Sequence, residues 1–373
     1  MRRFSLNPAF SVAAIWCVLC AVIAAAAEHT AGFRMLASHT LGTTGIMYRK
    51  VAFYKTHKTA STSLGAVIFR YAAKRSLRMF ARGNTTAACA GPVWTVACDN
   101  AHVLYPLPAH PQSADVVLHH VSHGTLEHSF LHLLDWYGQV LGEQFITVVP
   151  LRKPSARFVS WYNFFIKDKP AELPAGKTLD TWIESGKGAN GFALELGLSS
   201  EPQVSEFIAN MTLWRSSAAR RIFWFPSEEF GDALLMLGHH LGFNFMDLLN
   251  ERLFENRASP TQPEQEKRIQ QQVGWDQRIY DAAFDIFKAE REEIRQLQDT
   301  LSWDTKKELM AKAQAIFEQS IAQDSCALQR DWYRMSDLSY EGQISSDTLI
   351  APVPGAVRNN IMLQVYAEKQ LFC

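Results

Sequence analysis

The sequence has little cysteine and no excess of charge of either sign. It contains 6 cysteines in 373 residues, and 37 Lys and Arg side chains are matched by 37 Asp and Glu. Because the net charge is zero, no long-range field draws the chain toward nucleic acid, and we expect no nucleic-acid partner. No pair of Cys-x-x-Cys motifs and no Cys/His spacing typical of structural zinc occurs. Any anion-binding site must therefore be local.

The N-terminal segment departs from an ordinary globular composition. Met1-Arg2-Arg3 precedes an uncharged stretch, Phe4–Ala27, which is mostly apolar from Ala9 onward. Such a stretch is long enough to span a bilayer, and basic residues before it favour a cytoplasmic N-terminus. A cleaved signal peptide ending in the alanine run is the alternative, and it also delivers the body to the lumen. We expect a cytoplasmic segment 1–8, a signal anchor 9–27, a stem 28–48 and a lumenal domain 49–373.

The remaining cysteines and two sequons fit a lumenal domain. Outside the apolar segment four cysteines remain, an even number that predicts two disulfides in an oxidising compartment. Cys89 with Cys98 would close a short loop and Cys326 with Cys373 would tie down the C-terminal tail, although the other pairings stay open. Asn84 and Asn210 each begin an N-glycosylation sequon.

Apolar segments alternate with helical ones along the chain. The pattern predicts four strand-then-helix pairs and a helical part, 265–323, packed on the sheet. Buried strands alternating with helices are typical of an α/β fold with a mostly parallel sheet flanked by helices. Ligands of such sheets bind beyond the carboxyl ends of the strands. The predicted strands are 51–54, 115–119, 145–149 and 221–225, and the helices that follow them are 62–74, 126–137, 156–166 and 228–241.

The loop after the first predicted strand is rich in cationic and hydroxyl side chains. It reads Lys55-Thr56-His57-Lys58-Thr59-Ala60-Ser61-Thr62-Ser63 and leads into a helix. The N–H groups at a helix N-terminus attract phosphate or sulfate, and ammonium and hydroxyl groups add donors. The loop lacks the GxxxxGK[ST] pattern, which argues against a nucleoside-triphosphate hydrolase or kinase. A purely structural role, in which Ser61 or Thr62 caps the helix, is the alternative.

This loop resembles a sulfotransferase element. KTHKTAS after a short apolar strand is similar to the 5′-phosphosulfate loop of the galactose-3-O-sulfotransferases, and KTASTS is similar to the corresponding loop of the heparan sulfate 2-O-sulfotransferases. The resemblance implies a P-loop-NTPase-like sulfotransferase fold with a helical C-terminal part. It also implies 3′-phosphoadenosine 5′-phosphosulfate (PAPS) as co-substrate, contacted by Lys55, Lys58, Thr59, Ala60, Ser61 and Thr62.

A second segment resembles the family's 3′-phosphate element, in which an Arg and a Ser eight residues apart hold the 3′-phosphate. Arg152 and Ser160 occupy these places, and Asn190-Gly191-Phe192 resembles a further segment of the galactose-3-O-sulfotransferases. Two positions depart from the family pattern. Lys153 stands where an acidic residue is usual, and Pro150 is expected to interrupt the end of the strand.

A histidine cluster follows the second predicted strand. His120, in His-Val-Ser, is similar to the strand-end histidine that serves as base in the heparan sulfate 2-O-sulfotransferases, and His123 and His57 are the alternatives. A neutral histidine is suited to take a proton from a sugar hydroxyl near neutral pH. His128 and His132 lie four residues apart but lack a third ligand, so we expect no metal.

The resemblance implies a Golgi membrane enzyme of single-pass type II topology that sulfates a sugar hydroxyl. His120 and Lys58 would be catalytic, with Lys58 neutralising charge on the leaving group. The expected acceptor is the 3-hydroxyl of a terminal galactose on a glycolipid or glycoprotein. A uronic acid 2-hydroxyl in a glycosaminoglycan, or a catalytically inactive glycan-binding module, are the alternatives.

Overall fold

The computed structural model describes ten stretches of the chain, and several sequence predictions fall elsewhere. The signal anchor, most of the stem, Asn84, His123, His128 and all four lumenal cysteines lie outside the described residues. Within the described stretches no helix combines the length and apolar character needed to cross a membrane. The described residues are 47–75, 77–81, 114–120, 130–167, 178–217, 220–245, 247–249, 261–297, 301–322 and 350–352.

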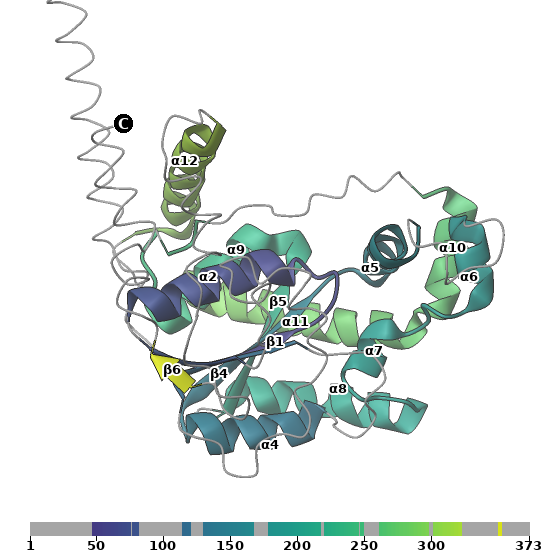
Figure 1. Ribbon diagram of the computed structural model, residues 1–373, viewed down its shortest axis with the longest axis horizontal. Coiled ribbons are helices and arrows are strands. Elements are labelled where there is room, and N and C mark those ends of the chain that lie inside the picture. The colour runs from purple at the N-terminus through teal and green to yellow at the C-terminus, as the bar shows by residue number, and fades with distance from the viewer. Residues whose placement is uncertain are drawn as a thin grey trace, which may run out of the picture.

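A six-stranded sheet forms the centre of the fold, in the order β5-β4-β1-β3-β2-β6. Five neighbouring strands are parallel, and only β6 runs antiparallel, beside β2. The prediction of a mostly parallel α/β sheet is confirmed, and Figure 1 shows helices on both faces. The strands are β1 Val51–Lys55, β2 Arg78–Ala81, β3 Val116–His120, β4 Phe145–Leu151, β5 Arg220–Pro226 and β6 Ile350–Pro352.

Alternate residues of β1 enter two different cores. Val51 and Phe53 pack with α2 (Ser61–Lys74) and α9 (Phe230–Leu241). Ala52 and Tyr54 pack with α4 (Phe130–Leu141), α7 (Gly191–Glu195) and α8 (Glu201–Ser216). Because successive side chains of a strand point to opposite faces, an unbroken apolar strand requires helices on both sides. The near-continuous apolar character of β1 and β4 has this origin.

The remaining helices lie at the edges of this layered centre. The long helix α11 (Gly274–Gln296) packs along β5 and contributes to both cores. Helix α5 (Pro154–Trp161) continues into a π-helical turn, η2 (Tyr162–Ile166), and a 3-10 turn, η3 (Ser227–Glu229), precedes α9. A third core joins Phe158 of α5 to Trp182 of α6 (Leu179–Ser185) and to Ile269 of α10 (Pro263–Gln272).

The expectation that every C-terminal helix packs on the sheet was wrong for two of them. Helix α10 packs on α5 and α6, and α12 (Trp303–Ala322) packs on α9. Figure 1 shows α12 and α10 on opposite sides of the molecule. Ile269 is the buried residue of α10, and one apolar position is too narrow a stripe to cover a sheet.

Pro150 does not interrupt β4, which runs on to Leu151 in register with β5. The prediction of a break was wrong because β4 pairs with β1 only as far as Val148. Beyond that point a missing N–H removes no ladder bond to β1. The Pro150 carbonyl instead accepts a hydrogen bond of 2.7 Å from the Thr56 hydroxyl.

Candidate nucleotide-binding site

Three of the predicted site segments follow neighbouring strands. In the sheet β1 lies between β3 and β4, and Lys55 at the end of β1 is in register with His120 at the end of β3. Arg152 directly follows β4. Parallel strands present their carboxyl ends at one edge, so the main chain at Lys55, His120 and Arg152 comes to the same edge of the sheet.

The main chain after β1 has two left-handed residues directly before a helix. Lys58 and Ala60 have φ angles of 60° and 59°, in the left-handed region, and α2 begins directly afterwards at Ser61. The first N–H groups of a helix have no acceptor within the helix and carry partial positive charge. Left-handed residues other than glycine cost about 1 to 2 kcal/mol each, so other contacts must hold them.

Hydroxyl groups of the loop provide part of that support. Thr59 and Ser61 donate to the Thr56 carbonyl at 3.1 and 2.7 Å, and Thr56 itself is tied to Pro150. All three side chains are buried. Thr59 and Ser61 were predicted to contact the nucleotide, and in the structure their hydroxyl groups donate to the main chain of the loop.

The cationic side chains around the loop are partly or largely buried. Lys55 is buried at the end of β1, whereas Lys58 is half-buried with Nζ 3.7 Å from the centroid of the Phe164 ring. Arg152 is half-buried and donates through Nη1 to the Lys58 carbonyl at 3.3 Å. Burial lowers the pKa of Arg152, opposed by the nearby Glu228 carboxylate. The structure thus joins the loop after β1 to the first residue of the second predicted element.

For the remaining predicted site residues the structure gives burial or main-chain position but no side-chain contact that bears on the site. Ser160 is buried on α5, and Ala60 is exposed in the loop. The side chains of Thr62 and His120 lie outside the described residues, although the main chain of both is placed. His132 is exposed on α4. Among the described residues no three His, Cys, Asp or Glu side chains gather as a metal site would require.

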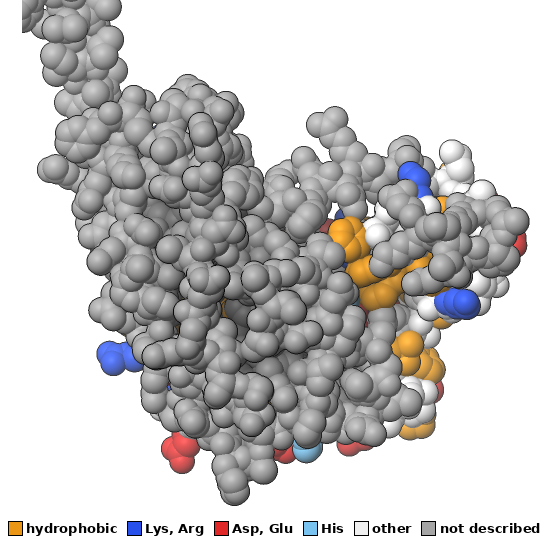
Figure 2. Space-filling model, viewed as in Figure 1, with side chains coloured by type: hydrophobic (Ala, Val, Ile, Leu, Met, Phe, Trp, Pro, Cys, Tyr) orange, Lys and Arg blue, Asp and Glu red, His pale blue; other side chains and the backbone are white. Residues whose placement is uncertain are grey.

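Aromatic side chains of α5 and η2 adjoin the loop. The His57 ring lies edge to face with Trp161 and Phe165, at centroid distances of 5.1 and 5.8 Å. Trp161, Phe164 and Phe165 are half-buried, and Figure 2 shows hydrophobic side chains reaching the surface in the region where α5 lies. A π-helical turn is often found at a functional site.

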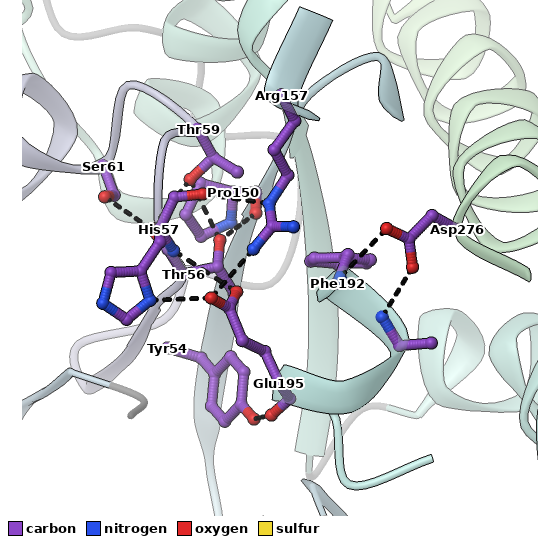
Figure 3. Close-up of polar contacts among 11 residues, drawn as sticks. Tyr54, Thr56, His57, Thr59, Ser61, Pro150, Arg157, Phe192, Glu195 and Asp276 are labelled. Carbon is purple, nitrogen blue, oxygen red and sulfur yellow. Dashed lines mark hydrogen bonds and ion pairs between the residues drawn. The ribbon is translucent and has the colours of Figure 1, made fainter. Parts of the chain in front are cut away.

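The sequence predictions missed a buried carboxylate, Glu195, that binds the loop from α7. Its Oε1 lies 2.7 Å from Nδ1 of His57, and its Oε2 accepts from the His57 N–H at 3.3 Å (Figure 3). Arg157 places Nη2 2.8 Å from the same Oε1, an ion pair that is not aligned as a hydrogen bond, and its Nε donates to the His57 carbonyl at 3.0 Å. The Tyr54 hydroxyl donates to the Glu195 carbonyl.

The predicted Asn190-Gly191-Phe192 segment forms the start of α7 and so positions Glu195. Asn190 has a φ of 47°, and its side-chain oxygen accepts from the Trp275 N–H at 2.9 Å. Asp276 of α11 accepts from the N–H groups of Phe192 and Ala193 at 3.0 and 2.8 Å. Burial raises the pKa of Asp276 to about 6, although Arg157 and these two N–H groups oppose the shift.

No family model, curated protein or solved structure matches this chain.

Proposed function

We propose that the protein is a PAPS-dependent carbohydrate sulfotransferase with a P-loop-NTPase-like sulfotransferase fold. The observation that carries the proposal is the contact between Arg152 and the Lys58 carbonyl, because it joins the two elements that resemble the 5′- and 3′-phosphate elements of such enzymes. One nucleotide with phosphates at both positions fits two adjacent anion sites better than a nucleoside triphosphate does.

The donors around the loop suit this nucleotide. The left-handed turn at Lys58 and Ala60 and the N-terminus of α2 would hold the 5′-phosphate. Arg152, together with Ser160, would hold the 3′-phosphate, since a guanidinium matches phosphate in charge and geometry. Lys55 adds a second cation at the end of β1, where the loop begins.

In the proposed reaction the hydroxyl oxygen of the acceptor sugar forms a bond to sulfur. The bond between sulfur and the bridging oxygen of the 5′-phosphate breaks, and the electron pair leaves with that oxygen. Lys58 neutralises the charge that develops there, and a histidine takes the hydroxyl proton. His120 is the proposed base because its strand lies beside β1, on the side opposite Arg152. The scheme consists of positioning and charge neutralisation and includes no metal.

We propose the 3-hydroxyl of a terminal galactose as the acceptor, on a glycolipid or glycoprotein, and a Golgi-lumenal location behind an N-terminal anchor. The galactose proposal rests on KTHKTAS and on the Asn190-Gly191-Phe192 segment. A uronic acid 2-hydroxyl is the second candidate, favoured by KTASTS and His-Val-Ser.

Calorimetric titration tests the nucleotide part of the proposal. The protein should bind 3′-phosphoadenosine 5′-phosphate (PAP) at least about tenfold more tightly than adenosine 5′-phosphate, because a charge-assisted contact contributes about 1.5 to 3 kcal/mol. Equal affinities, or tighter binding of ATP, would refute it. Transfer of labelled sulfate from PAPS to an array of galactosides and glycosaminoglycan fragments then identifies the acceptor.

A further inference from the structure

The ammonium group of Lys58 lies against the face of an aromatic ring. Its Nζ is 3.7 Å from the centroid of Phe164, inside the range of about 6 Å at which the electron-rich face of a ring attracts a cation. Both side chains are half-buried. Such a contact is stronger where water is partly excluded, because fewer water molecules compete for the ammonium group. The contact therefore restricts where the charge of Lys58 lies.

Lys58 is contacted at two points by the segment that follows β4. Its carbonyl accepts from Nη1 of Arg152 at 3.3 Å, and its ammonium group lies on Phe164 further along the same segment. The main chain of Lys58 is in the left-handed region, with a φ of 60°. The segment that runs from Arg152 through α5 to η2 thus contacts both the main chain and the end of the side chain.

The Phe164 ring is itself held by its surroundings. It belongs to the π-helical turn η2, in which the Lys167 N–H donates to the Tyr162 carbonyl at 2.9 Å, so the turn is one residue wider than an α-helical turn. The ring lies edge to face with Phe165 at a centroid distance of 4.8 Å, and Phe165 packs on Trp161. A ring that is already ordered can bind a cation at little further cost in entropy.

We propose that Phe164 is a positioning residue for sulfuryl transfer, whose ring face holds the Lys58 ammonium group at the loop after β1. The inference rests on the proposed function for the role of Lys58, which neutralises charge on the leaving oxygen. The ring need not be the only partner of Lys58. Because the charge on the leaving oxygen is greatest in the transition state, misplacing the ammonium group should lower kcat more than it weakens PAP binding.

Fluorinated phenylalanines at position 164 test the ring face without removing the ring. Each added fluorine draws electron density away from the face, so mono-, di- and trifluorinated phenylalanine should weaken the contact in steps. In the full-length protein, with PAPS and a galactoside acceptor, kcat should fall at each step. Phe164→Leu should lower kcat about three- to thirtyfold, whereas Phe164→Tyr keeps a ring face and should stay within about twofold of wild type.

Phe284 of α11 provides the matched control, because Lys288 lies over its ring with Nζ 5.2 Å from the centroid. The same fluorinated series at position 284 alters a lysine–phenylalanine pair outside the loop and should leave kcat unchanged. A kcat that does not respond to fluorination at position 164, or that responds equally at both positions, would overturn the proposal. Tighter PAP binding by Phe164→Leu would also overturn it, because the ring would then compete with the nucleotide for Lys58.

A nuclear magnetic resonance signal reports the contact itself, without nucleotide. Protons over a ring face are shifted upfield, so in protein labelled with 13C at lysine the Hε signals of Lys58 should lie upfield of those of an exposed lysine. They should move back in Phe164→Leu, and Lys58→Arg assigns them. Unshifted signals would overturn the proposal, whatever the PAP titration gives. Absence of PAP binding beside a shifted signal would refute the proposed function, and with it the role of Phe164 in sulfuryl transfer, although the contact would stand.

Discussion

Removing the Arg152 side chain tests the contact that joins the two nucleotide elements. Arg152 directly follows β4, is half-buried, and reaches the carbonyl of Lys58. If it binds the 3′-phosphate, Arg152→Ala should weaken binding of PAP far more than binding of adenosine 5′-phosphate. The two nucleotides differ only in the group that Arg152 is proposed to hold.

The magnitude follows from two separate contacts. A charge-assisted hydrogen bond to phosphate contributes about 1.5 to 3 kcal/mol, which corresponds to about a ten- to a hundredfold change in Kd. The bond to the Lys58 carbonyl is long, at 3.3 Å, and a hydrogen bond of this kind is worth about 1 kcal/mol. Its loss would disturb the loop for both nucleotides alike, so it cancels when the two affinity changes are compared.

Calorimetry with both nucleotides and both proteins gives the four affinities that this comparison needs. Lys153→Ala is the matched control, since it removes one positive charge from the next residue, whose side chain is exposed. Lys153→Ala should change the affinity for PAP and the affinity for adenosine 5′-phosphate by similar small factors. An equal loss of affinity for both nucleotides in Arg152→Ala would mean that Arg152 supports the loop and does not contact the 3′-phosphate.

Three further predictions concern the chemical step, stability and topology. His120→Ala should lower kcat about a hundred- to ten-thousandfold with PAP affinity within a few-fold, measured by transfer kinetics and calorimetry, and an unchanged kcat would exclude His120 as the base. The pKa of Asp276 is raised to about 6 from 3.8, so its neutral form favours folding and that contribution is lost as pH rises through 6. Between pH 5 and 7 the wild type should therefore lose about 1 kcal/mol relative to Asp276→Asn in urea unfolding, and parallel pH profiles would contradict this. Asn84 and Asn210 should carry glycans, so endoglycosidase should reduce the mass of the protein expressed in a secretory host, and an unchanged mass would argue against a lumenal domain.

Strands β1, β3, β4 and β5 and the helices that follow them were predictable because their signals are local, whereas β2 and β6 were not predicted. Each predicted strand is an apolar run, and each lies within a residue or two of the observed bounds. The short helix α7 and the helix α8 were not predicted. Only Val204, Phe207 and Met211 of α8 are buried, so its apolar stripe is too thin to stand out in the sequence.

The site was predictable only in its strand-end segments. Arg152 directly follows β4 and Lys58 lies in the loop that follows β1, and the topology alone brings strand ends together. Glu195 lies 138 residues from His57, and nothing in the spacing of the two residues connects them. One signal was present, since Glu195 is the single charged residue in the apolar run Gly191–Leu198. A buried charge requires a partner, but the sequence does not say which one.

The distance along the chain between His57 and Glu195 has a consequence for biosynthesis. A nascent chain folds from its N-terminus as it is made, so β1 and its loop leave the ribosome long before α7 exists. Until α7 docks, nothing from Glu195 holds His57, which precedes the left-handed residues Lys58 and Ala60. We therefore expect the loop to be one of the last parts to mature, with the amide of His57 protected from pulse-labelled hydrogen exchange later than the amides of β1. Earlier protection of His57 would contradict this order. A nascent or truncated chain that ends before α7 should already form its first strand and helix, yet lack a loop able to receive an anion.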